Sequence, residues 1–146
     1  MATYKAADLG TKNRHMGEFG NITGVWGEVT PTAGLLADVF QPVIIPAGLE
    51  VWDLDIVSDD LDSGGTALAV KVGYAPVNAD DGPVADDDYF SVASNFLSGA
   101  GRKVCVFQPI KFERAVVVTL TVTTAATTFA AGKVTVLVKG DGLGIK

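Results

Sequence analysis

The sequence predicts an all-β protein: a single-domain β-sandwich or jelly roll of about eight strands with an extended N-terminal arm. The main observation is a period-2 alternation of apolar and polar residues, which is typical of strands buried on one face. A second observation is that no segment carries a sustained apolar stripe at helical spacing. The third is size, because 146 residues, 48% of them hydrophobic, suffice for one domain with a real core.

The alternation is clearest near the C-terminus, in segments 116–123 and 133–139. Segment 116–123 places four apolar residues on one face and three threonines on the other: Val116, Val118, Leu120 and Val122 against Thr119, Thr121 and Thr123. We therefore expect the threonine face to be exposed. Eight segments are strand candidates: 22–29, 35–40, 52–56, 68–74, 89–93, 104–112, 116–123 and 133–139.

Within segment 52–56, Trp52 shares a face with Leu54 and Ile56, so we expect Trp52 in the core. The breaks between strands are marked by proline and glycine. Prolines at 42 and 46 bracket residues 43–45, which predicts an edge strand or a connection because proline cannot donate to a ladder. Pro109 predicts an edge strand or a bulge in segment 104–112. Asp62-Ser63-Gly64-Gly65 and Asp81-Gly82-Pro83 predict turns.

Charge is segregated along the chain, whose formal net charge is -6 and whose pI is about 4.5. Residues 50–88 hold 11 acids and one base, whereas residues 102–146 hold seven bases and two acids. Either the folded molecule keeps an acidic and a basic end, or strands from both blocks interleave and mix the surface charge. The acidic pI argues against a nucleic-acid partner.

The residues needed for catalysis or metal binding are scarce. Cys105 and His15 are the single cysteine and the single histidine, too few for a transition-metal site or a cysteine–histidine pair. The acid clusters at 59–62 and 86–88 do not match a calcium-loop spacing, and no phosphate-binding loop follows a strand. We expect Cys105 to be a buried apolar residue. The sequence thus predicts no catalytic, cofactor-binding or metal-binding residues, and a protein that is not an enzyme.

The chain divides into an arm at residues 1–20, a sandwich domain at 21–140 and a flexible tail at 141–146. No alternation persists in the first twenty residues, where charged residues mix with glycines. They form either a frayed terminus or an arm that orders against a neighbouring subunit. The candidate partner-binding residues lie in this arm: Tyr4, Lys5, Lys12, Arg14 and His15. No apolar run approaches the length of a membrane span, and no signal peptide is expected.

Three stretches carry a resemblance to a known family. They are the opening Met1-Ala2-Thr3-Tyr4-Lys5-Ala6-Ala7-Asp8-Leu9-Gly10, the Ile45-Pro46-Ala47-Gly48 turn that leads into a strand, and the acidic turn and strand at 59–74. Together they resemble small structural proteins encoded beside the capsid gene in tailed bacteriophages. The likeness covers about residues 1–10 and 40–75, and it assigns no role to any residue.

The resemblance implies a capsid decoration (cement) protein of the virion, made in the host cytoplasm and bound to the outer capsid surface. Its partners would be the major capsid protein and itself, as a homodimer or a homotrimer, with no nucleic acid, membrane or cofactor involved. It would stabilise contacts between major capsid protein subunits, with residues 1–20 as the clamp. Two alternatives stay open. One is a carbohydrate- or receptor-binding sandwich of a phage head fibre or tail component, using Trp26, Trp52, Tyr74 or Tyr89, and the other is a tail-tube or head-completion subunit.

Overall fold

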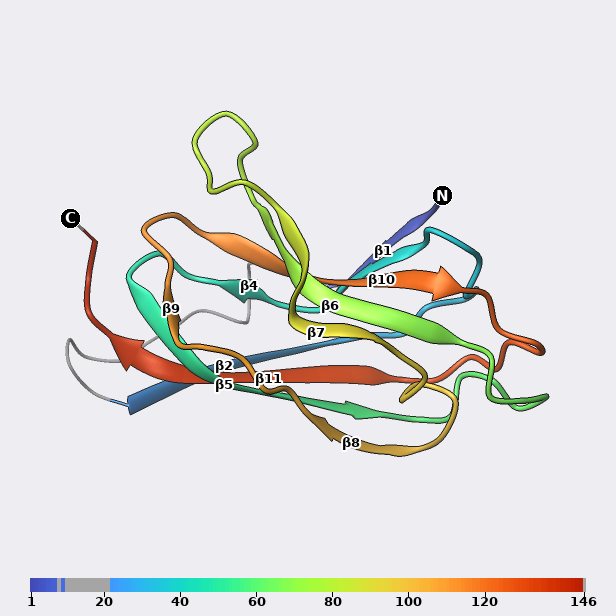
Figure 1. The fold of residues 1–146 in the computed structure, drawn as a ribbon. Helices are drawn as coiled ribbons and strands as arrows, with labels where there is room; N and C mark the ends of the chain where they lie inside the picture. Colours follow the sequence, from blue (N-terminus) through green and yellow to red (C-terminus); the bar gives the residue numbers. More distant parts are fainter. Residues whose placement is uncertain (8, 10–21, 146) are drawn as a thin grey trace.

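The all-β prediction is confirmed by a computed structural model, which describes residues 1–7, 9 and 22–145 (Figure 1). Two sheets pack face to face as a sandwich, and none of the described residues is helical. The strands are β1 (Thr3–Lys5), β2 (Ile22–Val29), β3 (Val39–Gln41), β4 (Ile44–Ile45), β5 (Leu49–Ser58), β6 (Ala69–Pro76), β7 (Asp86–Ser94), β8 (Gly101–Val104), β9 (Ile110–Lys111), β10 (Val116–Thr124) and β11 (Val134–Gly142).

The six-stranded sheet has the order β1-β3-β10-β6-β7, with β4 also pairing with β10. The five-stranded sheet has the order β2-β11-β5-β8, with β9 also pairing with β5. All pairs are antiparallel except that of β1 with β3. The two long C-terminal strands, β10 and β11, therefore lie inside the sheets between strands from earlier in the chain.

The described residues form eleven strands, so the expectation of about eight was too low. The additional strands are short: β1 has three residues, and β4 and β9 have two each. A period-2 pattern needs at least four residues to be visible, so strands this short leave no signal in the sequence.

Two predicted strands are interrupted. Segment 104–112 divides into the end of β8 at Val104 and the separate strand β9, with Pro109 between them. In segment 35–40, only the last two residues are in β3, because the amide of Asp38 donates to the carbonyl of Leu35 and closes a turn. Ala37 in this turn has a φ of 68°, which is left-handed and incompatible with a continuous strand.

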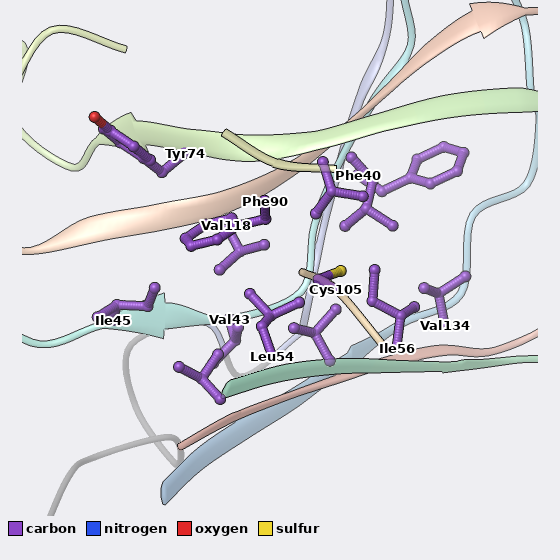
Figure 2. Close-up of a cluster of buried hydrophobic side chains, with 14 of the residues drawn as sticks. Phe40, Val43, Ile45, Leu54, Ile56, Tyr74, Phe90, Cys105, Val118 and Val134 are labelled. Carbon is purple, nitrogen blue, oxygen red and sulfur yellow. The ribbon is translucent and has the colours of Figure 1, made fainter. Parts of the chain in front are cut away.

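The core lies between the two sheets, as Figure 2 shows for Phe40, Leu54, Ile56, Val118 and Val134. Burial alternates along β11, as predicted. In β10 the predicted inner residues Val116, Val118, Leu120 and Val122 are buried, but Val117 and Thr119 between them are buried too. Cys105 is also buried here, which confirms its predicted role as a core residue.

The prediction that Thr119 is exposed is wrong. Only 4% of Thr119 is exposed, although it lies on the outer face of its sheet. Its register partner is Gly73 on β6. A Cβ on Gly73 would lie 2.0 Å from the carbonyl oxygen of Asp86, so the beginning of β7 passes directly over this point. The backbone of β7 therefore covers part of the outer face of the six-stranded sheet, a long-range contact that the alternation does not reveal.

Candidate interaction surfaces

The first of the predicted partner-binding residues, Tyr4, lies on β1, which extends the edge of the six-stranded sheet. Tyr4 is the register partner of Phe40 and packs its ring edge-on against that ring, with the centroids 5.8 Å apart. Lys5 is exposed beside it. Lys12, Arg14 and His15 lie outside the described residues. The structure thus places two of the five candidates, next to each other on one edge strand.

A buried aspartate, Asp38, holds β1 in place. Its Oδ1 accepts a hydrogen bond of 2.8 Å from the amide of Ala2, and its Oδ2 accepts one of 2.9 Å from the amide of Leu35. Only 1% of Asp38 is exposed. The sequence gives no sign of this role, because a lone acid in a strand-like segment does not indicate that it binds backbone amides.

The outer face of the five-stranded sheet carries exposed apolar residues, and we call it the tryptophan face. On β2, 58% of Trp26 is exposed, and in the register it lies beside Leu137 on the central strand β11. Trp52 lies on β5, on the other side of β11 from Trp26, and 39% of it is exposed. The face also includes exposed valines of β5 and β8, namely Val57 and Val104.

The exposure of Trp52 contradicts its predicted place in the core. The register between β5 and β11 shifts where Lys139 pairs with Asp53 and Gly140 pairs with Val51, so Trp52 is the extra residue of a β-bulge. The bulge turns Trp52 outward and keeps Val51 buried. Gly140 permits this arrangement, because a Cβ there would lie 2.1 Å from the carbonyl oxygen of Glu50.

Ion pairs connect the charged residues of the tryptophan face. Lys139 Nζ lies 2.6 Å from Asp53 Oδ2 and 3.8 Å from Asp55 Oδ2. Arg102 also pairs with Asp55 Oδ2, and this hydrogen bond raises the pKa of the Arg102 guanidinium. Asp55 is 3% exposed, and its Oδ1 accepts no hydrogen bond from the described part of the chain.

These pairs decide between the two predicted charge distributions. Arg102 and Lys139 come from the basic block of the sequence, whereas Asp53 and Asp55 come from the acidic block. Because β11 and β8 flank β5, the two blocks meet within one sheet. Arg114 joins them at a second place, 2.9 Å from Asp81. The surface charge is therefore mixed on this sheet and at the Arg114–Asp81 pair.

Acidic residues remain concentrated where β6 turns into β7. In Figure 1 this hairpin end projects away from the sandwich. Beneath it lies a groove of about 650 Å³, lined by Tyr74, residues 80–83 and residues 110–114. At the hairpin end, 89% of Val84 is exposed.

Two buried titratable residues, Asp62 and Cys105, have structural roles. Asp62 of the Asp62-Ser63-Gly64-Gly65 turn is buried and accepts backbone hydrogen bonds from Ala67, Leu68 and Thr128. These bonds, that of Thr128 foremost, lower its pKa. Burial raises the pKa of the Cys105 thiol to about 11, which disfavours the reactive thiolate.

Of the four aromatic residues considered as sugar-stacking platforms, Trp26 and Trp52 are exposed. Tyr74 is buried against Phe112, and Tyr89 is half-buried with its hydroxyl donating to the carbonyl of Gln108. In the described residues no cluster of three or more histidine, cysteine or acidic side chains is arranged to hold a metal ion. The same residues include no helix long and apolar enough to cross a membrane.

The fold is shared with chains from three phage capsid structures. A chain of the capsid of Ralstonia phage GP4 superposes with a TM-score of 0.75 and 18% identity, over 99% of this chain and 100% of that one. A chain of the cyanophage Pam1 capsid asymmetric unit gives 0.64 and 25% identity, over 84% of this chain and 86% of that one.

The third chain belongs to the acidic stable capsid structure of Helicobacter pylori bacteriophage KHP30. Its TM-score is 0.59 with 13% identity, over 90% of this chain and 94% of that one. No protein-family model and no curated protein matches the sequence.

Proposed function

We propose that this chain is a structural component of a phage capsid, and more specifically a decoration (cement) protein on the outer surface of the shell. The observation that carries the proposal is the end-to-end correspondence with a chain of the GP4 capsid, 99% of one chain and 100% of the other at a TM-score of 0.75. The match spans nearly the full length of both chains, so it is not confined to a shared substructure.

The chemistry of the described residues suits binding better than catalysis. The buried thiol of Cys105 has a raised pKa, and the buried carboxylate of Asp62 is occupied by backbone amides. The exposed features are instead those of interfaces: tryptophans on a flat sheet and an edge strand, β1, at the border of the other sheet. A cement protein would use such surfaces to bury area against major capsid protein subunits and against further copies of itself.

Residues 1–20 are the proposed clamp, with Tyr4, Lys5, Lys12, Arg14 and His15 as the contact residues. Support comes from β1, which ties the start of this segment to the sandwich through Phe40 and Asp38. The edge of β1 opposite β3 would accept a strand from a neighbouring subunit by β-augmentation. The remaining sandwich, residues 21–140, and the tail at 141–146 would carry the clamp without contributing to it, although β11 extends to Gly142.

The test is binding of the purified protein to capsids that lack it, followed by heating of the bound and unbound capsids. Saturable binding and a higher temperature of capsid disruption are expected. The triple variant Lys12→Ala, Arg14→Ala, His15→Ala leaves β1 intact and should reduce occupancy. The matched control, Lys71→Ala with Arg114→Ala, removes two cations that lie outside the arm and the tryptophan face and should bind like wild type. Capsids that bind no protein would contradict the proposal, and equal occupancy by the triple variant would contradict the clamp.

A carbohydrate-binding sandwich is a second candidate, favoured by the exposure of Trp26 and Trp52. Aromatic faces of this kind can stack on sugar rings. A glycan array probed with wild type and with Trp26→Ser tests it. Signals that the variant loses would support the candidate, and an array without signals would reject it.

A further inference from the structure

The two outer faces of the sandwich differ in what they offer to another protein. The face of the six-stranded sheet presents small residues in its middle, and the backbone of β7 already covers Gly73 and Thr119. The tryptophan face carries two exposed indole rings with Leu137 between their strands. Because tryptophan contributes disproportionately to binding free energy at interfaces, the tryptophan face is the stronger candidate for a contact surface.

The charges of the tryptophan face are largely neutralised within the chain. Three of its acids already form ion pairs with bases: Glu28 with Lys133 at 3.4 Å, Asp53 with Lys139 at 2.6 Å, and Asp55 with Arg102. The other two acids, Glu50 and Asp141, are register partners of each other. Asp141 lies next to Lys139, and Lys111, which is opposite Glu50 in the register, forms its ion pair with Glu113 at 2.8 Å. Five acids and four bases give this face a net charge of -1, which leaves -5 of the total -6 on the rest of the molecule.

This charge distribution selects the partner. Two copies of an acidic protein repel each other through most orientations, but least through the face that is nearly neutral. Both signs are also interspersed on the face, so that an acid of one copy can meet a base of the other. Since few of its polar groups are left unpaired, the face suits a protein surface better than the hydroxyl groups of a sugar.

The area is sufficient for self-association. The nine residues of β11 span about 30 Å, and four adjacent strands are about 19 Å wide. Contact over this face would bury about 500 Å² on each copy, or about 1,000 Å² in total, which reaches the lower bound of specific interfaces.

We infer that the tryptophan face binds the same face of a second copy of this chain across a twofold axis, with Trp26 and Trp52 as the anchors. Such a contact is isologous, since one patch serves both copies, and the two sheets would stack about 10 Å apart. The inference rests on the proposed function in one respect only. For a decoration protein that forms a homodimer or a homotrimer, it selects the homodimer. The opposite side of each sandwich, including β1, then stays available for the shell.

The experiment is sedimentation equilibrium of the isolated full-length protein from about 1 to about 200 µM. Wild type should be a dimer in the upper part of this range. Trp26→Ser should raise the dimer dissociation constant about 30-fold or more, the loss expected for an interface anchor. Trp52→Ser provides a second, independent variant. The matched control is Val92→Ser, which removes a 70% exposed apolar side chain from β7 of the other sheet and should leave the constant unchanged.

Several results would overturn the inference: a monomer throughout the range, a trimer, or a dimer that neither tryptophan variant weakens. Far-UV circular dichroism spectra of each variant should match wild type, so that a loss of dimer is not a loss of fold. Capsid binding, measured separately, distinguishes the two proposals. A monomer that still binds capsids would contradict the dimer and support the proposed function. A dimer that does not bind capsids would support the dimer and contradict the proposed function.

Discussion

Two acid-rich segments, 59–62 and 80–88, look alike in the sequence and behave differently in the fold. In the first, the carboxylates bind backbone amides: Asp59 accepts from Lys133, Asp60 from Asp62, and Asp62 from three residues. In the second, on the β6–β7 hairpin, four of the five acids are exposed, Asp81 and Asp87 form ion pairs, and the half-buried Asp86 accepts one long hydrogen bond of 3.4 Å from the amide of Asp88. Acids therefore stabilise the fold where several backbone amides donate to one carboxylate, and otherwise they contribute surface charge.

The strongest test of this difference is Asp62→Ala. The substitution leaves the amides of Ala67, Leu68 and Thr128 without their acceptor and weakens the attachment of the loop at 126–130 to the turn at 62–65. We expect the Tm to fall by about 10 °C, measured by circular dichroism. Asp80→Ala on the hairpin is the matched control and should leave the Tm unchanged. Equal effects of the two substitutions would eliminate the distinction between the segments.

Acid titration gives the next largest effect. The folded-state pKa of Asp62 is lowered from its ordinary value of 3.8, so the folded protein holds this proton less tightly than the unfolded chain does. The resulting stabilisation is complete above the ordinary value and is lost as the pH falls through the folded pKa. Urea unfolding from pH 6 to about pH 2 should therefore show a steeper loss of free energy in wild type than in Asp62→Asn. Parallel curves would contradict the assignment.

Asp38, which lies outside both segments, is a single buried acid that also accepts hydrogen bonds from backbone amides. Asp38→Ala removes the acceptor of the Ala2 and Leu35 amides, so the turn before β3 and the attachment of β1 both weaken. We expect a loss of about 1–3 kcal/mol in the free energy of unfolding, measured in urea. Asp38→Asn keeps one acceptor oxygen and should cost less. A loss no larger than that of an exposed acid would show that these two bonds do not hold the N-terminus.

Asp59 is exposed, although its Oδ2 accepts a hydrogen bond of 2.8 Å from the amide of Lys133. Since water can replace this acceptor, Asp59→Ala should cost only about 0.5–1 kcal/mol in urea denaturation. A loss of free energy of unfolding equal to that of Asp62→Ala would mean that burial does not govern the strength of these hydrogen bonds.

The smallest effect is expected on the hairpin. The triple variant Asp80→Asn, Asp86→Asn, Asp88→Asn removes three of its five acids, and the free energy of unfolding should stay within about 0.5 kcal/mol of wild type. A larger loss in urea denaturation would reveal that these carboxylates support the fold.

The sequence predicts well those features that depend on a local repeat of residues. Alternation identified the two C-terminal strands and their buried valines, because burial on one face of a strand repeats every second residue. It also supported the two-sheet sandwich. Cys105 was correctly placed in the core by its apolar neighbours.

The errors arise where distant segments meet. Trp52 is exposed because a bulge, made possible by Gly140 on the neighbouring strand, shifts the alternation of β5 by one residue. Thr119 is buried because β7 crosses over Gly73. The acceptor role of Asp62 depends on Thr128, 66 residues later in the chain. Each of these positions is decided by a tertiary contact, which no local pattern of residues encodes.

The proposed place of this protein on the capsid exterior is tested most directly by a cryo-electron microscopy reconstruction of the virion. We predict density for this β-sandwich outside the shell, in contact with more than one major capsid protein subunit. A well-resolved shell with no such density, or density only inside the shell or in the tail, would contradict the account.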